Sequence, residues 1–281
     1  MLVTTRKMLE DAKAGGYAVG AFNAENAEMV WGIVHAAEEL RSPVIIQTTS
    51  SSLKYLSPAY FAGIVRAAAD ATPVPVALHL DHGASYELAK ECIDCGYTSV
   101  MIDGSALPFE ENLALARRVR DYAEQFGVPV EAELGKIGGK EDDVSSDGDQ
   151  YTDPLEAREY CERSGISSLA VAIGTAHGVY AKAPKLDLDR ASEIAAVVRV
   201  PLVMHGASGL ADDVMREGVR KGISKINFAT ELRIAFTQAI KAYLEKDPDV
   251  IDPKKYLTGA RMAVAELTKA KMLVCGSDGK A

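Results

Sequence analysis

Short apolar segments alternate with amphipathic segments along the whole chain, and this order limits the folds that it can adopt. The apolar segments are residues 17–22 (YAVGAF), 43–47 (PVIIQ), 74–80 (VPVALHL), 98–103 (TSVMID), 128–134 (VPVEAEL), 167–174 (SSLAVAIG), 200–206 (VPLVMHG) and 223–228 (ISKINF). Between them lie segments of helical length, such as 27–40 and 109–127, with apolar residues three and four positions apart. Strands that are apolar throughout are typical of a parallel sheet covered on both faces. The pattern predicts an α/β fold, a (β/α)8 barrel, rather than a doubly wound sheet.

The length fits one barrel domain that spans residues 1–281, because α/β barrels of roughly 250 residues form a single domain. One connection is exceptional. Residues 138–153, after the fifth strand, are rich in Gly, Ser and Asp, and we expect a long loop that acts as a lid. After the eighth strand, residues 229–246 and 257–274 predict two extra helices, the second packing on the barrel or on a partner subunit.

Composition excludes several classes of partner. The formal net charge of -9 disfavours a broad basic face for nucleic acid or anionic lipid. Four cysteines are sparse for this length, the N-terminal residues lack the apolar core of a signal peptide, and no apolar run approaches the roughly 20 residues of a membrane helix. We therefore expect a cytoplasmic protein that binds a small molecule, and neither nucleic acid nor a membrane.

Polar side chains follow every predicted strand. Catalytic groups of such barrels lie at the C-terminal ends of the strands. The polar residues at these ends are Asn23, Thr49, Asp81, His82, Asp103, Glu131, Glu133, His177, His205 and Asn227. The sequence thus predicts a polar site around one rim of the barrel.

Three of the five histidines, His82, His177 and His205, follow strands three, six and seven. Neutral imidazoles are common zinc ligands, and three protein ligands with one open position are the pattern of catalytic zinc. One such histidine alone is more often a hydrogen-bonded core or loop residue. Three on one rim favour a zinc site. We interpret His35, in a helical segment, and His79, inside a strand, as structural.

Asp81 directly precedes His82 in HLDHG. A carboxylate beside a metal can be a ligand, can orient a ligand, or can transfer a proton. The residues alone leave these three roles open.

Glycines accompany the other two histidines, in AIGTAHGVYAK and VMHGASG. Small residues let backbone N–H groups approach an anion, and barrels commonly bind phosphate in the loops after strands seven and eight. The alternative is that these glycines only turn the chain. The residues that would form a phosphate cradle are Gly178, Lys182, Gly206, Ser208 and Thr230.

A series of motifs extends over nearly the whole chain: AFNAEN, SPVII, HLDHG, SVMIDGS, VEAELGKIGGKEDD, YTDP, SLAVAIGTAHGVY, PLVMHGASG and KINFATEL. The series resembles the class II, zinc-dependent ketose-bisphosphate aldolases, which cleave fructose 1,6-bisphosphate or tagatose 1,6-bisphosphate. The resemblance implies a (β/α)8 barrel, Zn²⁺, a monovalent cation (Na⁺ or K⁺) near the substrate phosphate, and a homodimer or homotetramer.

The resemblance also implies roles for single residues. Zinc is expected on His82, His177 and His205, with Glu133 as an alternative ligand. Asp81 is expected to exchange the proton of the C4 hydroxyl, Glu141 on the long loop to handle the proton on the dihydroxyacetone phosphate carbon, and Asn227 to support the enediolate. The phosphate contacts are expected on Gly178, Lys182, Gly206, Ser208 and Thr230, and further substrate contacts on Asn23, Thr49, Ala229 and Arg261.

The substrate-facing residues resemble both branches of the family. Ala229 in NFATEL stands where many fructose-bisphosphate enzymes carry an acidic or amide residue, and looks more like the tagatose branch. Arg261 in TGARMAV resembles an arginine of the fructose branch that binds the distal phosphate, in its own or a neighbouring subunit. Thr49 replaces a serine. We expect cleavage of fructose 1,6-bisphosphate to dihydroxyacetone phosphate and glyceraldehyde 3-phosphate, with tagatose 1,6-bisphosphate or another phosphorylated keto sugar as the alternative.

Two other classes of function remain. A barrel of this kind can be a non-catalytic subunit that stabilises a partner, but Asp81, Glu141 and the three histidines are intact. An unrelated zinc hydrolase is disfavoured because the glycine cradle and the lid suit a phosphorylated substrate.

Overall fold

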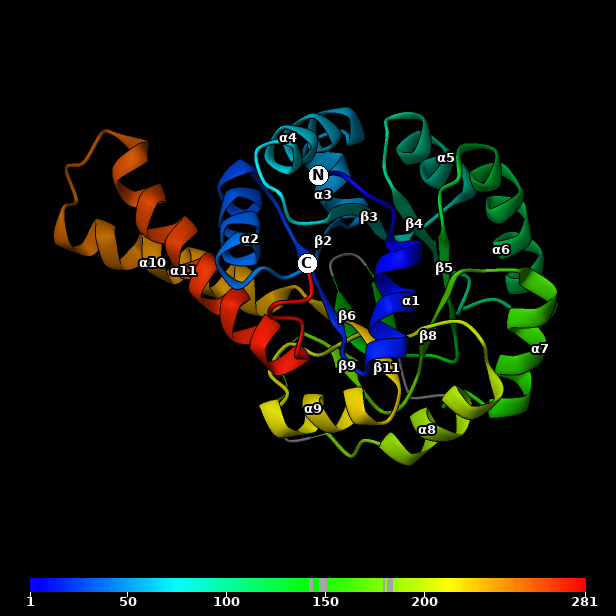
Figure 1. The fold of residues 1–281 in the computed structure, drawn as a ribbon. Helices are drawn as coiled ribbons and strands as arrows, with labels where there is room; N and C mark the ends of the chain where they lie inside the picture. The colour runs from blue at the N-terminus through cyan, green and yellow to red at the C-terminus, as the bar shows by residue number, and fades with distance from the viewer. Residues whose placement is uncertain (142–143, 147–150, 179, 181–183) are drawn as a thin grey trace.

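The eight predicted strands close into a parallel barrel (Figure 1). This computed structural model describes residues 1–141, 144–146, 151–178, 180 and 184–281. The barrel strands follow the spatial order β1-β11-β10-β8-β5-β4-β3-β2, which confirms the (β/α)8 architecture. They are β1 (Val19–Asn23), β2 (Val44–Thr48), β3 (Val76–Gly83), β4 (Ser99–Ile102), β5 (Val130–Leu134), β8 (Ser168–Val171), β10 (Leu202–Met204) and β11 (Ile223–Phe228).

Helices cover the outside of the barrel. They are α1 (Thr5–Gly15), α2 (Ala27–Leu40), α3 (Ser50–Tyr55), α4 (Pro58–Asp70), α5 (Tyr86–Asp94), α6 (Phe109–Ala123), the short 3₁₀ helix η1 (Glu124–Phe126), α7 (Pro154–Ser164), α8 (Leu188–Val197), α9 (Asp212–Arg220), α10 (Thr230–Lys246) and α11 (Pro253–Cys275). Local sequence sets several of their ends. The side chains of Asn26 and Ser85 accept the backbone N–H of Met29 and Leu88 and so cap α2 and α5. None of the helices within the described ranges is long and apolar enough to cross a membrane.

The side chains inside the barrel change character along its axis. Helix α1 covers one end, where it packs on an apolar layer. Helix α1 contributes Met8, Leu9 and Ala12 to this contact, and the layer itself consists of Tyr17, Val19, Ala21, Ile45 and Ala77. A fully buried polar layer follows, formed by His79, Ser99, Glu131 and Lys225. Because every second residue of a strand points inward, the next inward residue after His79 is Asp81, and after Lys225 it is Asn227. The site therefore lies above a polar floor.

The segment expected to be a loop after the fifth strand is partly β-structure. Its described residues form β6 (Gly138–Glu141) and β7 (Val144–Ser146), an antiparallel pair. Strand β6 also pairs in parallel with β9 (Ala176–His177). Gly139 has φ of 96°, and a β-carbon there would lie 2.4 Å from the His177 carbonyl oxygen. Glycine is required for this close approach, so the composition that predicts a loop instead permits a small three-stranded sheet.

The two predicted C-terminal helices are α10 and α11, which pack against each other and project from the barrel (Figure 1, left). Helix α11 also packs along α2. In this α10–α11 arm, Leu232 is the only buried residue of α10, whereas α11 buries eight residues between Ala260 and Cys275. The exposed large apolar side chains of the arm are Ile234, Leu244, Ile251, Met262 and Leu273.

Candidate functional site

Strand β3 ends in an irregularity that brings two consecutive side chains into one site. His82 has φ of 46°, in the left-handed region, and the pairing of β3 with β4 shifts register between Leu80 and Gly83. Neighbouring side chains of a regular strand point to opposite faces, and a bulge breaks this alternation. Backbone strain of this kind is concentrated at functional sites. It allows the side chains of Asp81 and His82 to reach the same end of the barrel.

The structure brings the three predicted histidines together. His82 is the second-last residue of β3, His177 ends β9, and His205 directly follows β10. Ligand nitrogens of the three rings lie within 4.8 Å of one another, and the ring centroids of His82 and His205 are 4.7 Å apart. This group has the residue types and the spacing to hold a metal ion.

Two carboxylates orient two of these rings. His82 Nδ1 lies 2.8 Å from Asp103 Oδ2, and His205 Nε2 lies 3.0 Å from Glu131 Oε1. A carboxylate only accepts hydrogen bonds, so each of these ring nitrogens carries the hydrogen, and the other nitrogen presents its lone pair. Those lone pairs, on His82 Nε2 and His205 Nδ1, face each other across 2.9 Å. A metal ion that both nitrogens coordinate would replace this repulsion by two bonds, so the geometry fits a bound metal ion.

The acidic groups around the cluster differ in their protonation. Burial raises the pKa of Asp103, but hydrogen bonds from His82 and Ser105 outweigh it and hold that pKa well below its ordinary value. The pKa of Glu131 is also low, because the attraction of Lys225 and the hydrogen bond from His205 overcome burial. Burial and the charge of Asp103 raise the pKa of Glu133, whose Oε2 lies 3.5 Å from His205 Nδ1. A positive ion at the cluster would favour ionised Glu133.

Three side-chain amides hold the Asp81 carboxylate beside the histidines. Asn23 Nδ2 and Gln47 Nε2 donate to Asp81 Oδ2 at 2.9 and 3.0 Å, and Asn227 Nδ2 donates to Oδ1 at 3.1 Å. Asp81 is fully buried. Gln47 Oε1 and Asn227 Oδ1 are buried too, and within the described ranges neither makes a hydrogen bond. Buried acceptors left open in this way are suited to ligand hydroxyl groups.

Most of the predicted phosphate-contact residues converge at the ends of β10 and β11. Ser208 Oγ accepts the backbone N–H of Ala229 at 3.3 Å, next to Thr230, the first residue of α10. No side chain among the described residues caps this helix. Gly206 has φ of 68°, and Gly178 directly follows His177 in the sequence.

Other predicted residues lie elsewhere or outside the description. Arg261 is on α11, with its guanidinium carbon 4.0 Å from the centre of the Trp31 ring on α2. Thr49 caps α3 by accepting the backbone N–H of Ser52. Lys182 lies outside the described residues. Glu141 is the last residue of β6, and its side chain also falls outside the description.

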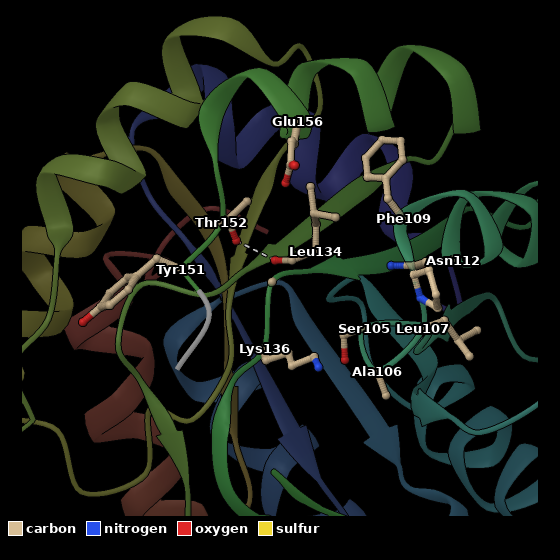
Figure 2. Close-up of a pocket in the computed structure, with 12 residues that line it drawn as sticks. Ser105, Ala106, Leu107, Phe109, Asn112, Leu134, Lys136, Tyr151, Thr152 and Glu156 are labelled. Atoms are coloured by element: carbon tan, nitrogen blue, oxygen red, sulfur yellow. Dashed lines mark hydrogen bonds between the residues drawn. The ribbon is translucent and has the colours of Figure 1, made fainter. Parts of the chain in front are cut away.

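A cavity of about 360 Å³ adjoins the centre (Figure 2). It lies between the ends of β4 and β5 and the first turns of α6 and α7, and its wall includes Ser105, Asn112, Lys136 and Glu156. The Lys136 side chain points toward Ser105 in Figure 2. Ser105 Oγ donates to Asp103 Oδ1 at 2.7 Å. None of the three histidines is among its described lining residues, so this cavity neighbours the cluster and is not its entrance.

Sequence reasoning missed Gln47 and Lys225 and assigned no role to Glu131 or Asp103. A signal for the inward position of Glu131 and Lys225 is present in the strands. Each lies two residues before an assigned site residue, Glu133 and Asn227, and alternate residues share one face of a strand. The pairing of Glu131 with Lys225 could not be predicted from the strand pattern, because the two residues are 94 positions apart in the sequence.

The comparisons agree with this geometry. A sequence model of the family described as "Fructose-bisphosphate aldolase class-II" matches residues 3–280. The chain is similar to the YdjI aldolase of Escherichia coli K12, with 39% identity, both chains covered in full and a TM-score of 0.88. It is also similar to a putative fructose-1,6-bisphosphate aldolase of Coccidioides immitis, with 30% identity over 98% of this chain and 96% of that one and a TM-score of 0.90. The fructose-bisphosphate aldolase (Fba) of Campylobacter jejuni is 25% identical over 100% and 97% of the two chains, with a TM-score of 0.83. The chain therefore belongs to the class II fructose-bisphosphate aldolase family and is an aldolase, a carbon–carbon lyase.

Proposed function

We propose that this enzyme catalyses the zinc-dependent, reversible aldol cleavage of a phosphorylated ketose and that its main substrate is fructose 1,6-bisphosphate. The observation that carries the proposal is the position of Asp81. Three side-chain amides hold its carboxylate by hydrogen bonds. Asp81 directly precedes His82, whose ring lies in one cluster with the rings of His177 and His205. Bond cleavage between C3 and C4 of a ketose needs a proton acceptor for the C4 hydroxyl and a stabiliser of the negative charge that develops toward C2.

The three histidines would hold the metal, with Glu133 as the alternative ligand. Zinc bound there would act as a Lewis acid toward the C2 carbonyl oxygen. Imidazole ligands suit zinc, and the facing nitrogens of His82 and His205 suit a cation. No lysine that forms a Schiff base is required by this chemistry.

Asp81 would remove the C4 hydroxyl proton in the cleavage direction and return it to the aldehyde oxygen in condensation. The hydrogen bonds from Asn23, Gln47 and Asn227 restrict rotation of the carboxylate and so keep it in the reactive position. The free amide oxygens of Gln47 and Asn227 would accept hydrogen bonds from substrate hydroxyls. Glu141 would handle the proton at the carbon of dihydroxyacetone phosphate.

The phosphate on C1 would bind at the ends of β10 and β11. The first N–H groups of α10, which no described side chain caps, lie close to Ser208 and provide the positive end of a helix dipole. Gly178, Lys182 and Gly206 would complete this cradle. Lys182 would contribute a positive charge beside the phosphate in a chain whose net charge is -9.

The choice of ketose rests on two kinds of support. Two of the similar structures are described as fructose-bisphosphate aldolases, which supports fructose 1,6-bisphosphate. Ala229, at the start of α10, keeps tagatose 1,6-bisphosphate as the alternative, because no polar side chain at residue 229 is available to a substrate hydroxyl. Arg261 would bind the distal phosphate only if α11 belonged to a neighbouring subunit or moved, since its guanidinium stacks on Trp31.

We also propose that the enzyme is a homodimer or homotetramer. The projecting α10–α11 arm supports this, because its apolar side chains include Ile251, which is 96% exposed. Exposed apolar groups gathered on one feature commonly mark an interface.

A coupled assay for dihydroxyacetone phosphate tests the reaction. The purified enzyme is measured with and without a strong chelator, on fructose 1,6-bisphosphate and on its C4 epimer tagatose 1,6-bisphosphate. We expect chelation to abolish cleavage, restoration by Zn²⁺, and a higher kcat/KM for the fructose substrate. Full activity after complete metal removal would contradict the zinc mechanism, and a higher kcat/KM for tagatose would reverse the substrate assignment.

A further inference from the structure

A buried ion pair lies directly beneath the histidine cluster, inside the barrel. Lys225 Nζ is 2.9 Å from Glu131 Oε2 and 3.1 Å from Oε1. Both side chains are at most 1% exposed. Burial of two charges carries a large desolvation penalty, and such a pair is often replaceable by apolar residues without loss of stability. Fold stability alone therefore does not explain why this pair stands at the centre of the barrel.

The pair contacts one of the three histidines through a defined atom. Glu131 Oε1 lies 3.0 Å from His205 Nε2, at positions that are both buried. With an ammonium group on both of its oxygens, Glu131 is a carboxylate and can only accept. His205 Nε2 therefore carries a hydrogen, and the lone pair that the ring can offer to a metal is on Nδ1.

That lone pair points into the candidate metal centre. His205 Nδ1 faces His82 Nε2 at 2.9 Å and Glu133 Oε2 at 3.5 Å. Were the hydrogen on Nδ1 instead, it would occupy the space between these atoms. The tautomer of His205 thus decides whether the centre offers three ligand nitrogens or two.

We propose that Glu131 and Lys225 are positioning residues, which hold the His205 ring in the tautomer and orientation that make Nδ1 its metal-ligating atom. The inference rests on the proposed zinc centre, and it means that buried residues of the barrel interior orient one of the ligands of that centre. Lys225 acts through Glu131: it balances the buried charge and fixes the carboxylate in place. Hydrogen-bond partners of this kind typically change metal affinity 10- to 100-fold.

The polar layer continues below the pair and offers a control. Lys225 Nζ lies 3.4 Å from His79 Nε2, His79 Nδ1 lies 2.8 Å from Ser99 Oγ, and Thr5 Oγ1 donates to Ser99 Oγ at 2.9 Å. Ser99 is buried like the pair, and in the described part of the chain its hydroxyl bonds to His79 and Thr5 and to no histidine of the cluster. Ser99→Ala should therefore disturb the interior without changing His205.

The experiment compares Glu131→Gln, Lys225→Met, the double variant and Ser99→Ala in the full-length protein. Zinc affinity is measured by competition with a chromophoric chelator at one fixed pH, and stability by urea unfolding of the metal-free proteins. We expect each single variant of the pair to weaken zinc binding 10- to 100-fold and to lose stability, because it leaves an unpaired buried charge. The double variant should regain stability, since both charges are gone, but should keep the weakened zinc binding.

The double variant separates positioning from charge balance. Zinc affinity equal to that of the wild type in this variant would overturn the proposal, because it would show that the pair serves only the fold. An equal loss of zinc affinity in Ser99→Ala would overturn it too, since any change in the interior would then have the same effect.

A second readout does not need the metal. Nitrogen-15 NMR of the histidine side chains in the metal-free protein reports which ring nitrogen carries hydrogen. We expect His205 to be protonated at Nε2 in the wild type and to populate both tautomers in Glu131→Gln. Protonation of His205 at Nδ1 alone in the wild type would contradict the inference. If the wild type binds no zinc, the proposed metal centre fails, and this NMR result still decides the role of Glu131.

Discussion

The backbone of His177 passes so close to Gly139 that a β-carbon on residue 139 would lie 2.4 Å from the His177 carbonyl oxygen. The two residues pair in register between β6 and β9. The segment after the fifth barrel strand therefore supports, through its backbone, the strand that carries one of the three clustered histidines. A side chain at position 139 has no room unless β9 moves.

We predict that Gly139→Ala weakens zinc binding and lowers kcat by about 100-fold, the effect expected of a displacement of about 1 Å at a catalytic centre. The φ of 96° adds strain for any residue other than glycine. Zinc competition and steady-state kinetics test this. Gly63→Ala is the matched control, because its β-carbon would meet nothing within 4 Å and alanine favours a helix by roughly 0.5–1 kcal/mol. The prediction is wrong if the two variants bind zinc and turn over alike.

Asp81→Ala should keep zinc and lose cleavage. The carboxylate is the proposed proton acceptor, and removal of a general base typically lowers the rate by about 10²–10⁴. Metal content and kcat are measured on the same preparation. Asp103→Ala is the contrasting variant: it removes the acceptor from His82 Nδ1, so its first effect should be weaker zinc binding. Wild-type turnover in Asp81→Ala would refute the assigned role.

The stability of the metal-free protein should decrease as the pH falls below about 6.5. Burial, and then the positive charge of Lys225, lower the pKa of His79 well below its ordinary value. The unfolded chain, with a histidine pKa of about 6.5, then binds a proton that the folded chain does not bind. The free energy of unfolding should fall by about 1.4 kcal/mol per pH unit well below 6.5, and this contribution is fully present above that pH.

Urea unfolding between pH 5 and 7.5 measures this dependence, with His79→Gln as the comparison. The variant should show a pH slope that is smaller by one proton, whatever its absolute stability. Equal slopes in the two proteins would mean that His79 is protonated in the folded state.

The α10–α11 arm should mediate self-association. Sedimentation equilibrium is expected to give a mass of at least twice 30.0 kDa. Ile251→Lys places a charge on the most exposed apolar residue of the arm and should shift the protein toward the monomer. Leu155→Lys, at an exposed position on α7, should leave the mass unchanged. A monomeric wild type would exclude a stable oligomer at the concentration used.

Local sequence patterns were sufficient to predict the eight strands of the barrel. All eight apolar segments became barrel strands, and the polar residues at their ends meet at one rim, because strand and helix periodicity depends on neighbours a few positions apart. The three candidate metal-ligating histidines could also be selected from the sequence, because each follows a predicted strand. A parallel barrel places the C-terminal ends of all its strands on one side, so His82 and His205 were expected to meet without any knowledge of distances.

Residues far apart in the chain settled the rest. Strand pairing between residues 38 positions apart, Gly139 and His177, turned part of a predicted loop into a sheet. The left-handed backbone of His82 changed the direction of its side chain. The tautomer of His205 depends on Glu131, 74 positions away, and on Lys225 beyond it. No local preference encodes these partners, because the stagger of the closed barrel decides which residues of different strands share a layer.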